Sequence, residues 1–345
     1  MILISYGTRP EYIKLKPLMD RLKQDCKGDS LVYKTLFTGQ HKDLVKQKAD
    51  YNIEIKDGKN RLDAIIASIM NGVDFKFEGI STVIVQGDTT SAYAVALSAF
   101  NHQVKVVHLE AGLRTYNLQQ PYPEEANRQM ISRITDLHLC PTKAAYDNLI
   151  NEKVPGEIAI VGNTVLDNLV GIDTTDEHKV LVTIHRRENH DNIQVWFKQI
   201  DKIASENKHY EFCLPIHPNP AVQKHKNILK NVKVVEPMDY NILLDYLSKC
   251  SFVITDSGGI QEEAAFLRKP CLVCRKETER AEGLGNFSLL CGSPEDLAQR
   301  FEDLDSLEMS GDCPYGDGKS SEKIIRLLKN EDNYSSKKGI KRGSF

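Results

Sequence analysis

Short apolar runs alternate with amphipathic stretches along most of the chain, and this alternation restricts the possible folds more than any other feature. In the first half, the apolar runs 2–5, 31–37 and 104–109 lie between segments of helical periodicity such as 13–22 and 91–100. Buried strands that alternate with helices are typical of a parallel sheet with helices on both faces. The pattern therefore predicts a doubly wound α/β fold.

The chain of 345 residues is longer than a single hydrophobic core usually allows. The alternation weakens in the polar segment 170–179 and then resumes, with strands expected at 180–184 and 252–255 and a helix at 193–205. We therefore expect two α/β domains, a closing helix and a polar tail. The expected bounds are 1–166 for the first domain, 167–318 for the second, about 319–330 for the helix and 331–345 for a disordered tail.

Composition excludes several classes of function. A net charge of -3, from 45 basic and 48 acidic residues, predicts no global attraction to nucleic acid or to an anionic membrane. The apolar start is broken at Gly7, and no later window approaches the length of a membrane span. Eight cysteines, among them Cys271 and Cys274 in a strand pattern, favour buried thiols and not a disulfide framework or a metal site. These features predict a cytoplasmic protein.

Residues 108–128, HLEAGLRTYNLQQPYPEEANR, carry three acids between an expected strand and an expected helix. Glycine and two prolines in this segment disfavour regular structure, so Glu110, Glu124 and Glu125 are expected where an open α/β sheet binds its ligands. In the alternative interpretation, Glu124 and Glu125 only occupy the first helical turn, where the macrodipole favours acids.

Two glycine-containing turns link an apolar run to a helix, GTRPE at 7–11 and TDSGGIQEE at 255–263. In the second, Ser257, Gly258 and Gly259 come just before the helix, so backbone amides and a hydroxyl can bind phosphate oxygens. A simple tight turn is the alternative. Neither turn matches a Walker loop or the dinucleotide fingerprint.

Charged side chains recur at the ends of the other expected strands. Guanidinium groups bind phosphate in a bidentate manner, although arginine and lysine more often stay exposed or form salt bridges. The cations are Arg9, Lys14, His185, Arg186, Arg187 and Arg280, and the acids are Asp88, Glu110, Glu124 and Glu263. Asp88 is alternatively the N-cap of the following helix. Cations for a diphosphate and carboxylates for a sugar together predict chemistry on a carbon atom of a nucleotide sugar.

Ten motifs in this order carry a family resemblance: GTRPE, GDTTSA, HLEAGLRT, PYPEEANR, VGNTVLD, HRREN, HPNP, TDSGGIQEE, TER and YGDGK. Together they resemble the non-hydrolysing UDP-N-acetylglucosamine 2-epimerases, from Gly7 to about Lys329. The resemblance implies a GT-B fold, with two Rossmann-like domains, the active site in the cleft between them, and a final helix that returns to the first domain. It also implies a homodimer that interconverts UDP-N-acetylglucosamine and UDP-N-acetylmannosamine without a cofactor.

The resemblance also assigns roles to individual residues. It places the acid/base groups at Asp88, Glu110 and Glu124 and the active-site histidine at His185. The nucleotide contacts that it implies are Arg9, Lys14, Arg128, Ser257, Gly258, Gly259, Glu263 and Arg280. Gln40 and His41 correspond to contacts of an activating second substrate molecule. Because Asp43 and Lys59 depart from the glutamine and arginine usual there, retention of that activation stays open.

The chemistry of the substrate explains the need for several carboxylates. No carbonyl acidifies the C2 proton, so loss of UDP from C1 must come first and make that proton removable. The remaining alternatives are an epimerase of another UDP-2-acetamido sugar, a hydrolysing epimerase, a GT-B glycosyltransferase and a nucleotide-sugar binder without activity. The joint presence of Asp88, Glu110, Glu124 and His185 disfavours the last of these.

Overall fold

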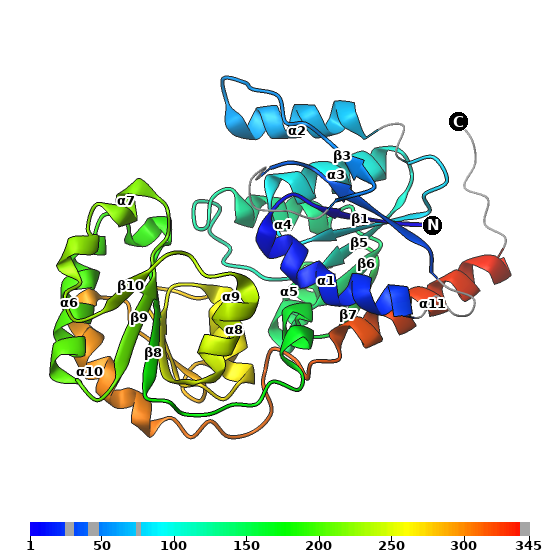
Figure 1. Cartoon of the computed structure of the whole chain (residues 1–345). Helices are drawn as coiled ribbons and strands as arrows, with labels where there is room; N and C mark the ends of the chain where they lie inside the picture. The colour runs from blue at the N-terminus through cyan, green and yellow to red at the C-terminus, as the bar shows by residue number, and fades with distance from the viewer. Residues whose placement is uncertain (25–30, 41–47, 74–76, 339–345) are drawn as a thin grey trace. The chain divides into compact units, whose positions relative to one another are not determined.

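The computed structural model describes residues 1–24, 31–40, 48–73 and 77–338 (Figure 1). The chain divides into two compact units. Unit 1 comprises Met1–Asn168 with Gly318–Phe345, and unit 2 comprises Leu169–Asp317. The divisions after Asn168 and Asp317 lie close to the expected ones after residues 166 and 318.

Unit 1 contains a parallel sheet in the strand order β3-β2-β1-β4-β5-β6-β7. Its strands are β1 (Ile2–Tyr6), β2 (Tyr33–Phe37), β3 (Tyr51–Asn52), β4 (Thr82–Gln86), β5 (Lys105–Leu109), β6 (Leu137–Cys140) and β7 (Glu157–Ile160). The chain runs outward in one direction from β1 and in the other from β4. This reversal creates a switch point, where doubly wound sheets bind ligands at the carboxyl ends of their strands.

Helices cover both faces of the sheet in unit 1 because successive strand residues point to opposite faces. Ile4 packs in one core cluster with Leu15 and Leu18, whereas its neighbour Leu3 packs in another with Ile65. The helices of this unit are α1 (Arg9–Gln24), α2 (Arg61–Gly72), α3 (Thr90–Asn101), α4 (Glu124–Ser132), α5 (Lys143–Asn151) and α11 (Ser320–Lys338).

Helix α11 returns the chain to unit 1. Ile324 and Leu328 belong to the same core cluster as Leu15 of α1, and Figure 1 shows the two helices side by side. The Asp167 carboxylate accepts the backbone N–H groups of Ser320 and of Ser321, at 2.9 and 2.7 Å, and so caps the start of the helix. The motif VGNTVLD thus serves to anchor α11.

The end of α11 corrects an expectation. The helix was expected to end near residue 330 and to be followed by disorder, but it continues to Lys338. Residues 331–338 include neither glycine nor proline, and Gly339 is the first helix-breaking residue after them. Polarity alone therefore did not locate the helix end. Residues 339–345 lie outside the described part of the chain.

Unit 2 contains a second parallel sheet, in the order β10-β9-β8-β11-β12-β13. Its strands are β8 (Lys179–Thr183), β9 (Glu211–Pro215), β10 (Lys233–Val235), β11 (Cys250–Thr255), β12 (Cys271–Val273) and β13 (Ser288–Leu290). Its helices are α6 (Ile193–Glu206), α7 (Pro220–Gln223), α8 (Tyr240–Ser248), α9 (Gly258–Phe266) and α10 (Leu297–Glu302). Trp196 of α6 packs on one face of the sheet, and Leu247 of α8 packs on the other. Both units are therefore doubly wound.

Cys271 and Cys274 are core residues, as the sequence favoured. Both are completely buried, and burial raises the pKa of both thiols. Within the described residues the cysteines form no disulfide, and Cys26 lies outside that part of the chain. No helix there is long and apolar enough to cross a bilayer.

Candidate active site

The charged residues of unit 1 gather where β1, β4 and β5 end, on both sides of the switch point. Glu110 follows β5 directly and has a φ of 64°, a left-handed conformation that is unusual for a glutamate. Its Oε2 lies 2.5 Å from Lys14 Nζ and also accepts a hydrogen bond from the side-chain amide of Gln86. Both Glu110 and Lys14 are largely buried. The sequence pointed to Glu110 and Lys14 separately, but it gave no signal for Gln86.

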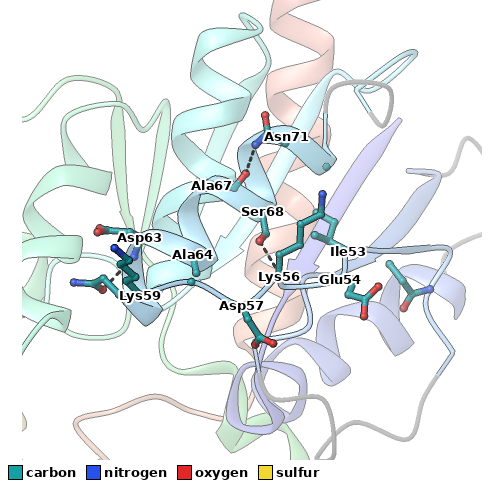
Figure 2. A pocket seen from close by; sticks show the side chains of 14 residues that line it. Ile53, Glu54, Lys56, Asp57, Lys59, Asp63, Ala64, Ala67, Ser68 and Asn71 are labelled. Carbon is teal, nitrogen blue, oxygen red and sulfur yellow. Dashed lines mark hydrogen bonds between the residues drawn. The ribbon is translucent and has the colours of Figure 1, made fainter.

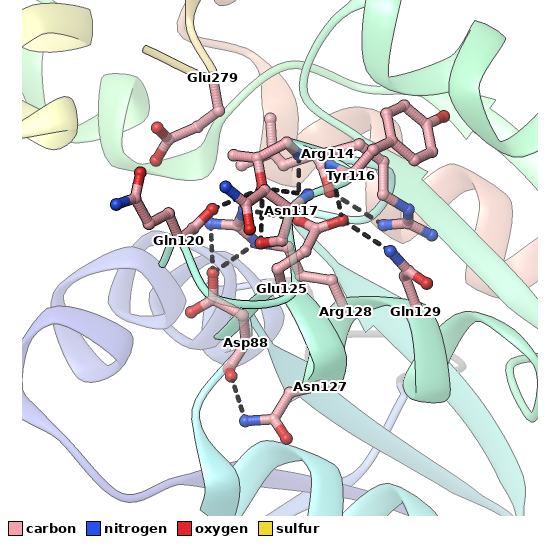
Figure 3. Close-up of polar contacts among 12 residues, drawn as sticks. Asp88, Arg114, Tyr116, Asn117, Gln120, Glu125, Asn127, Arg128, Gln129 and Glu279 are labelled. Carbon is pink, nitrogen blue, oxygen red and sulfur yellow. Dashed lines mark hydrogen bonds and ion pairs between the residues drawn. The ribbon is translucent and has the colours of Figure 1, made fainter. Parts of the chain in front are cut away.

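Asp88, which follows β4, forms a second ion pair. Its Oδ2 accepts hydrogen bonds from Arg128 Nε and Nη2, each at 2.7 Å, and Nη1 of the same guanidinium lies 3.3 Å from Glu125 Oε2 (Figure 3). Asn127 donates to the backbone carbonyl of Asp88 at 2.9 Å. Arg128 was expected as a nucleotide contact, and the structure pairs it with two carboxylates. Asp88 remains 26% exposed and can reach a ligand.

Asp88 is not the N-cap of α3, so that alternative is wrong. The cap is Thr89, whose hydroxyl oxygen accepts the backbone N–H of Ala92 at 3.1 Å. The Asp88 side chain turns instead to Arg128, because a guanidinium offers a stronger, charge-assisted hydrogen bond than a backbone amide does.

Glu124 and Glu125 occupy the first turn of α4, as the alternative interpretation proposed. Their surroundings differ, however. Glu125 is completely buried and accepts the backbone N–H groups of Thr115 and Tyr116, at 3.0 and 3.2 Å, whereas Glu124 is half-buried. Of the two, Glu124 is therefore the carboxylate that a substrate can reach.

The turn between β1 and α1 is filled by its own acid. Glu11 Oε2 accepts the backbone N–H groups of Gly7 and Thr8, at 2.5 and 2.9 Å, and Oε1 accepts the Thr89 hydroxyl at 2.5 Å. Burial raises the pKa of Glu11, although these hydrogen bonds act in the opposite direction. A side chain at Gly7 would clash with the hydroxyls of Thr38 and Ser91. The sequence did not identify Glu11 as a site residue.

In unit 2, a buried aspartate organises the segment after β8. Asp256 Oδ2 accepts the backbone N–H groups of His185 and Arg186, at 2.8 and 2.7 Å, and the side-chain amide of Asn189 at 3.0 Å. Asp256 is completely buried. The HRREN motif therefore folds around the carboxylate of the residue that directly follows β11, the neighbour of β8 in the sheet. The side chain of Arg187 lies outside the described part of the structure.

His185 lies against a second imidazole. Its ring stacks on that of His217 with centroids 5.1 Å apart and an interplanar angle of 5°, and its Nδ1 lies 3.5 Å from Asp256 Oδ1. Burial lowers the pKa of His185, while Asp256 acts in the opposite direction. A lowered pKa favours a neutral ring at pH 7, and such a ring donates from one nitrogen and accepts at the other.

The turn before α1 is filled by the Glu11 carboxylate, whereas the turn before α9 is open. Ser257 is the N-cap, yet its side chain makes no capping hydrogen bond within the described residues. Apart from its chain neighbours and the backbone of α9, a Cβ at Gly259 would meet no atom of the described residues nearer than the Ser257 hydroxyl, at 4.0 Å. At Gly258, in contrast, it would clash with the guanidinium of Arg280. Backbone amides at the start of a helix bind anions, so this turn can accept a phosphate.

Arg280 is held by two acids. Its Nε pairs with Glu262, and its Nη1 lies 2.6 Å from Glu279 Oε1. Glu279 also pairs with Arg275 at 2.8 Å. Glu263, another expected nucleotide contact in unit 2, accepts a hydrogen bond from the hydroxyl of Tyr240 at 2.9 Å. The expected nucleotide contacts Arg280 and Glu263 thus lie beside the open turn or on its helix, with protein partners of their own.

Unit 1 also contains a cavity of about 670 Å³ between residues 52–60 and α2 (Figure 2). Lys59, at the position of the family's activator-site arginine, lines it together with Lys56 and Asp63. Gln40 is not among the lining residues: its side chain accepts the backbone N–H of Ser91 at 3.1 Å, and its carbonyl oxygen accepts Arg61 Nη2 at 3.4 Å. His41 and Asp43 lie outside the described residues. The activator contacts therefore remain a prediction.

Comparisons of the sequence and of the structure with known proteins identify the same family. The family described as UDP-N-acetylglucosamine 2-epimerase matches residues 24–329. A UDP-N-acetylglucosamine 2-epimerase of Bacillus subtilis (strain 168) is 37% identical over 361 residues, which cover 95% of this chain and 94% of the relative.

Two solved structures are similar over nearly the whole chain. A putative UDP-N-acetylglucosamine 2-epimerase from Listeria monocytogenes matches with a TM-score of 0.89 at 33% identity and covers 97% of each chain. The Neisseria meningitidis UDP-GlcNAc 2-epimerase bound to UDP-GlcNAc matches with a TM-score of 0.86 at 33% identity, over 95% of this chain and 99% of that one. With its two doubly wound units of the GT-B fold, this chain belongs to the UDP-N-acetylglucosamine 2-epimerase family.

Proposed function

We propose that this protein is a non-hydrolysing epimerase that reversibly inverts C2 of UDP-N-acetylglucosamine and yields UDP-N-acetylmannosamine. The observation that carries the proposal is the pairing of acids and cations in unit 1. Glu110 pairs with Lys14 and Asp88 with Arg128, so two of the three acid/base candidates contact a cation that the resemblance assigns to the nucleotide. Family membership and the open turn before α9 support the same function.

The reaction begins with opening of the bond between C1 and the UDP oxygen. The electron pair of that bond leaves with UDP, a carboxylate removes the proton from C2, and the C2–H electrons form the C1=C2 bond of a 2-acetamidoglucal. Return of a proton to the opposite face of C2, with attack of a β-phosphate oxygen of the same UDP molecule on C1, gives the epimer. No water is consumed, and UDP is not released.

The ion pairs suit this sequence of steps. When Asp88 or Glu110 accepts a proton, it releases part of the charge of Arg128 or Lys14 just as negative charge develops on the leaving diphosphate. Each general acid/base contact contributes roughly 10² to 10⁴ in rate. Cations already in place before the reaction lower the barrier further, because they need no reorganisation.

Residues of both units contribute to the proposed binding of one substrate molecule. Asp88, Glu110 and Glu124 act on the hexose, and a neutral His185 donates to or accepts from the reacting groups. The proposed nucleotide contacts are Arg9, Lys14, Arg128, Ser257, Gly258, Gly259, Glu263 and Arg280. We also propose that the protein is a homodimer in the cytoplasm, and analytical ultracentrifugation tests the dimer. Its product would supply N-acetylmannosamine-type sugars for surface polysaccharide.

A single incubation tests the function. With UDP-N-acetylglucosamine in deuterated water, both epimers should gain deuterium at C2 while free UDP does not accumulate, as followed by NMR and by chromatography of nucleotides. Release of UDP in a one-to-one ratio with sugar would instead indicate a hydrolysing epimerase. Exchange with only a different UDP-2-acetamido sugar would move the substrate assignment.

A further inference from the structure

Glu125 occupies a position that the reaction as proposed does not use. It is completely buried at the start of α4, and all its described partners are donors. Oε2 accepts the backbone N–H of Thr115 at 3.0 Å and Arg128 Nη1 at 3.3 Å. Oε1 accepts the backbone N–H of Tyr116 at 3.2 Å and the side-chain amide of Gln129 at 2.9 Å.

The partner that links Glu125 to the chemistry is Arg128. An arginine side chain is long and flexible, and a contact at one end of the guanidinium leaves the group free to rotate. In this structure Nε and Nη2 face Asp88 while Nη1 faces Glu125, so the plane of the guanidinium is fixed from two sides (Figure 3). The orientation of the Asp88 carboxylate therefore depends on an acid that it does not contact.

Glu125 also ties the same guanidinium to the loop that follows β5. Tyr116 has a φ of 58°, a left-handed conformation that its backbone contact with Glu125 helps to hold. One carboxylate thus joins the backbone after Glu110 to the cation beside Asp88. Asp88 and Glu110 follow the neighbouring strands β4 and β5, and Glu125 couples the segments that carry them.

We infer that Glu125 is a positioning residue: it acts through Arg128 to hold Asp88 in its productive orientation while it fixes the loop at Thr115 and Tyr116. The inference rests on the proposed function, in which Asp88 exchanges a proton with the sugar. Glu125 itself is buried and does not touch the substrate.

A second acid supplies a matched control. Glu152 clamps the same loop through Arg114, with Nε to Oε1 at 2.7 Å and Nη2 to Oε2 at 3.0 Å. Arg114 is the residue just before Thr115 and is fully buried. The described contacts of Glu152 include neither Arg128 nor Asp88. Glu152→Gln therefore weakens the loop clamp without touching the guanidinium that faces Asp88.

The test is a double-mutant cycle on the full-length enzyme with Glu125→Gln, Arg128→Lys and the combined variant. Glutamine keeps the shape of glutamate, but both oxygens of Glu125 face donors. Whichever oxygen the NH2 group replaces, it meets a donor, so the contacts cannot all be kept. We expect kcat to fall roughly 10- to 100-fold in each single variant, as is typical when an orienting partner is removed. KM in Glu125→Gln should change by a smaller factor than kcat does.

Coupling within the cycle separates positioning from general damage. Because both single changes break one unit, the combined variant should be within about threefold of the worse single variant. Glu152→Gln should keep kcat within about threefold of wild type and should combine additively with Arg128→Lys. Additive losses for Glu125→Gln and Arg128→Lys, or equal losses of kcat in Glu125→Gln and Glu152→Gln, would overturn the inference. If Glu125→Gln does not fold, Glu125→Asp takes its place in the cycle.

A structural measurement keeps this test independent of the proposed activity. In a crystal structure of the Glu125→Gln variant, the Arg128 guanidinium should have lost its two-bond contact with Asp88. Retention of both bonds would contradict the inference even if the protein epimerises its substrate. Lack of C2 exchange in the wild-type enzyme would instead contradict the proposed function, and the crystal structure would still decide the role of Glu125.

Discussion

The turns before α1 and α9 have the same topology but opposite chemistry. Each follows a buried parallel strand, contains glycine and begins a helix. In the first, the Glu11 carboxylate accepts hydrogen bonds from the backbone N–H groups of Gly7 and Thr8. In the second, Ser257 makes no capping bond among the described residues, and the space in front of Gly259 is open. One turn is closed by its own anion, and the other can accept a foreign one.

The position and partners of the nearest acids decide this difference. Glu11 lies in the first turn of α1 and folds back onto the amides. The acids of α9 lie further along the helix and have other partners, since Glu262 pairs with Arg280 and Glu263 accepts from Tyr240. A glycine-containing turn is therefore an anion site only when the helix that follows does not supply the anion.

The largest expected effect follows from filling the open turn. Gly259→Asp places a carboxylate at the start of α9. There it competes with the phosphate groups of UDP for the backbone amides, just as Glu11 occupies the amides before α1. We expect UDP to bind about 100-fold more weakly, a loss of about 2.7 kcal/mol, as measured by titration calorimetry. Thermal stability should not fall, because an acid is favourable at a helix N-terminus.

Gly259→Asn is the control for size in this experiment, because asparagine has the shape of aspartate without its charge. It should weaken UDP binding far less than Gly259→Asp does. Equal losses would point to steric exclusion, and no loss in either variant would place the diphosphate elsewhere.

The reverse change, emptying the closed turn, should have the next largest effect. Glu11→Ala leaves the buried N–H groups of Gly7 and Thr8 without their acceptor, at a cost of about 2 kcal/mol of unfolding free energy. Urea denaturation measures this loss, and UDP affinity should stay near that of wild type. Inorganic phosphate should restore stability to Glu11→Ala more than it stabilises wild type. A variant as stable as wild type would show that the carboxylate does not satisfy these amides.

The smallest expected effect is on the pH dependence of stability, and it comes from a buried histidine beside the end of β4. His108 is buried, its Nε2 lies 2.7 Å from the carbonyl oxygen of Gly87, and burial lowers its pKa from 6.5 to about 3. As the pH falls below 6.5, the unfolded chain binds a proton that the folded protein does not bind until about pH 3. The stability is therefore complete above pH 6.5 and is lost progressively on acidification.

The substitution His108→Gln keeps a donor for the carbonyl of Gly87 and removes the ionisable ring. Between pH 7 and pH 5.5 the variant should lose about 1 kcal/mol less unfolding free energy than wild type does, as measured by urea denaturation. Identical slopes for His108→Gln and wild type would mean that water reaches His108 in the folded protein.

The sequence identified both turns and favoured the second as a phosphate site, but it did not show that Glu11 fills the first. Strand and helix alternation located both sheets, because burial on two faces leaves a continuous apolar signal. Which amides remain open depends on side-chain direction, which no spacing shows. Asp88 and Arg128 are 40 residues apart, and Gln86 and Glu110 are 24 apart. Pairs at such separations are created by the fold, so the individual residues were predictable but their partners were not.

Local competition explains why the alternative interpretation of Asp88 as an N-cap is wrong. Asp88 and Thr89 are adjacent and both suit an N-cap. Thr89 caps α3 because Asp88 has a stronger partner in Arg128, which lies on another helix. Glu125 was identified in the sequence only as a companion of Glu124. Its contacts with the loop and with Arg128 depend on the complete burial that the fold imposes.

Opening of the bond between C1 and the UDP oxygen is the step on which the whole mechanism depends. The most direct measurement starts from UDP-N-acetylglucosamine with oxygen-18 in the bridge between C1 and the β-phosphorus. During turnover the label should spread into the non-bridging oxygens of the β-phosphate, because free UDP in the site can rotate before it adds back. Inversion at C2 with all the label still in the bridge would contradict an elimination in which the β-phosphate turns before UDP adds back to C1.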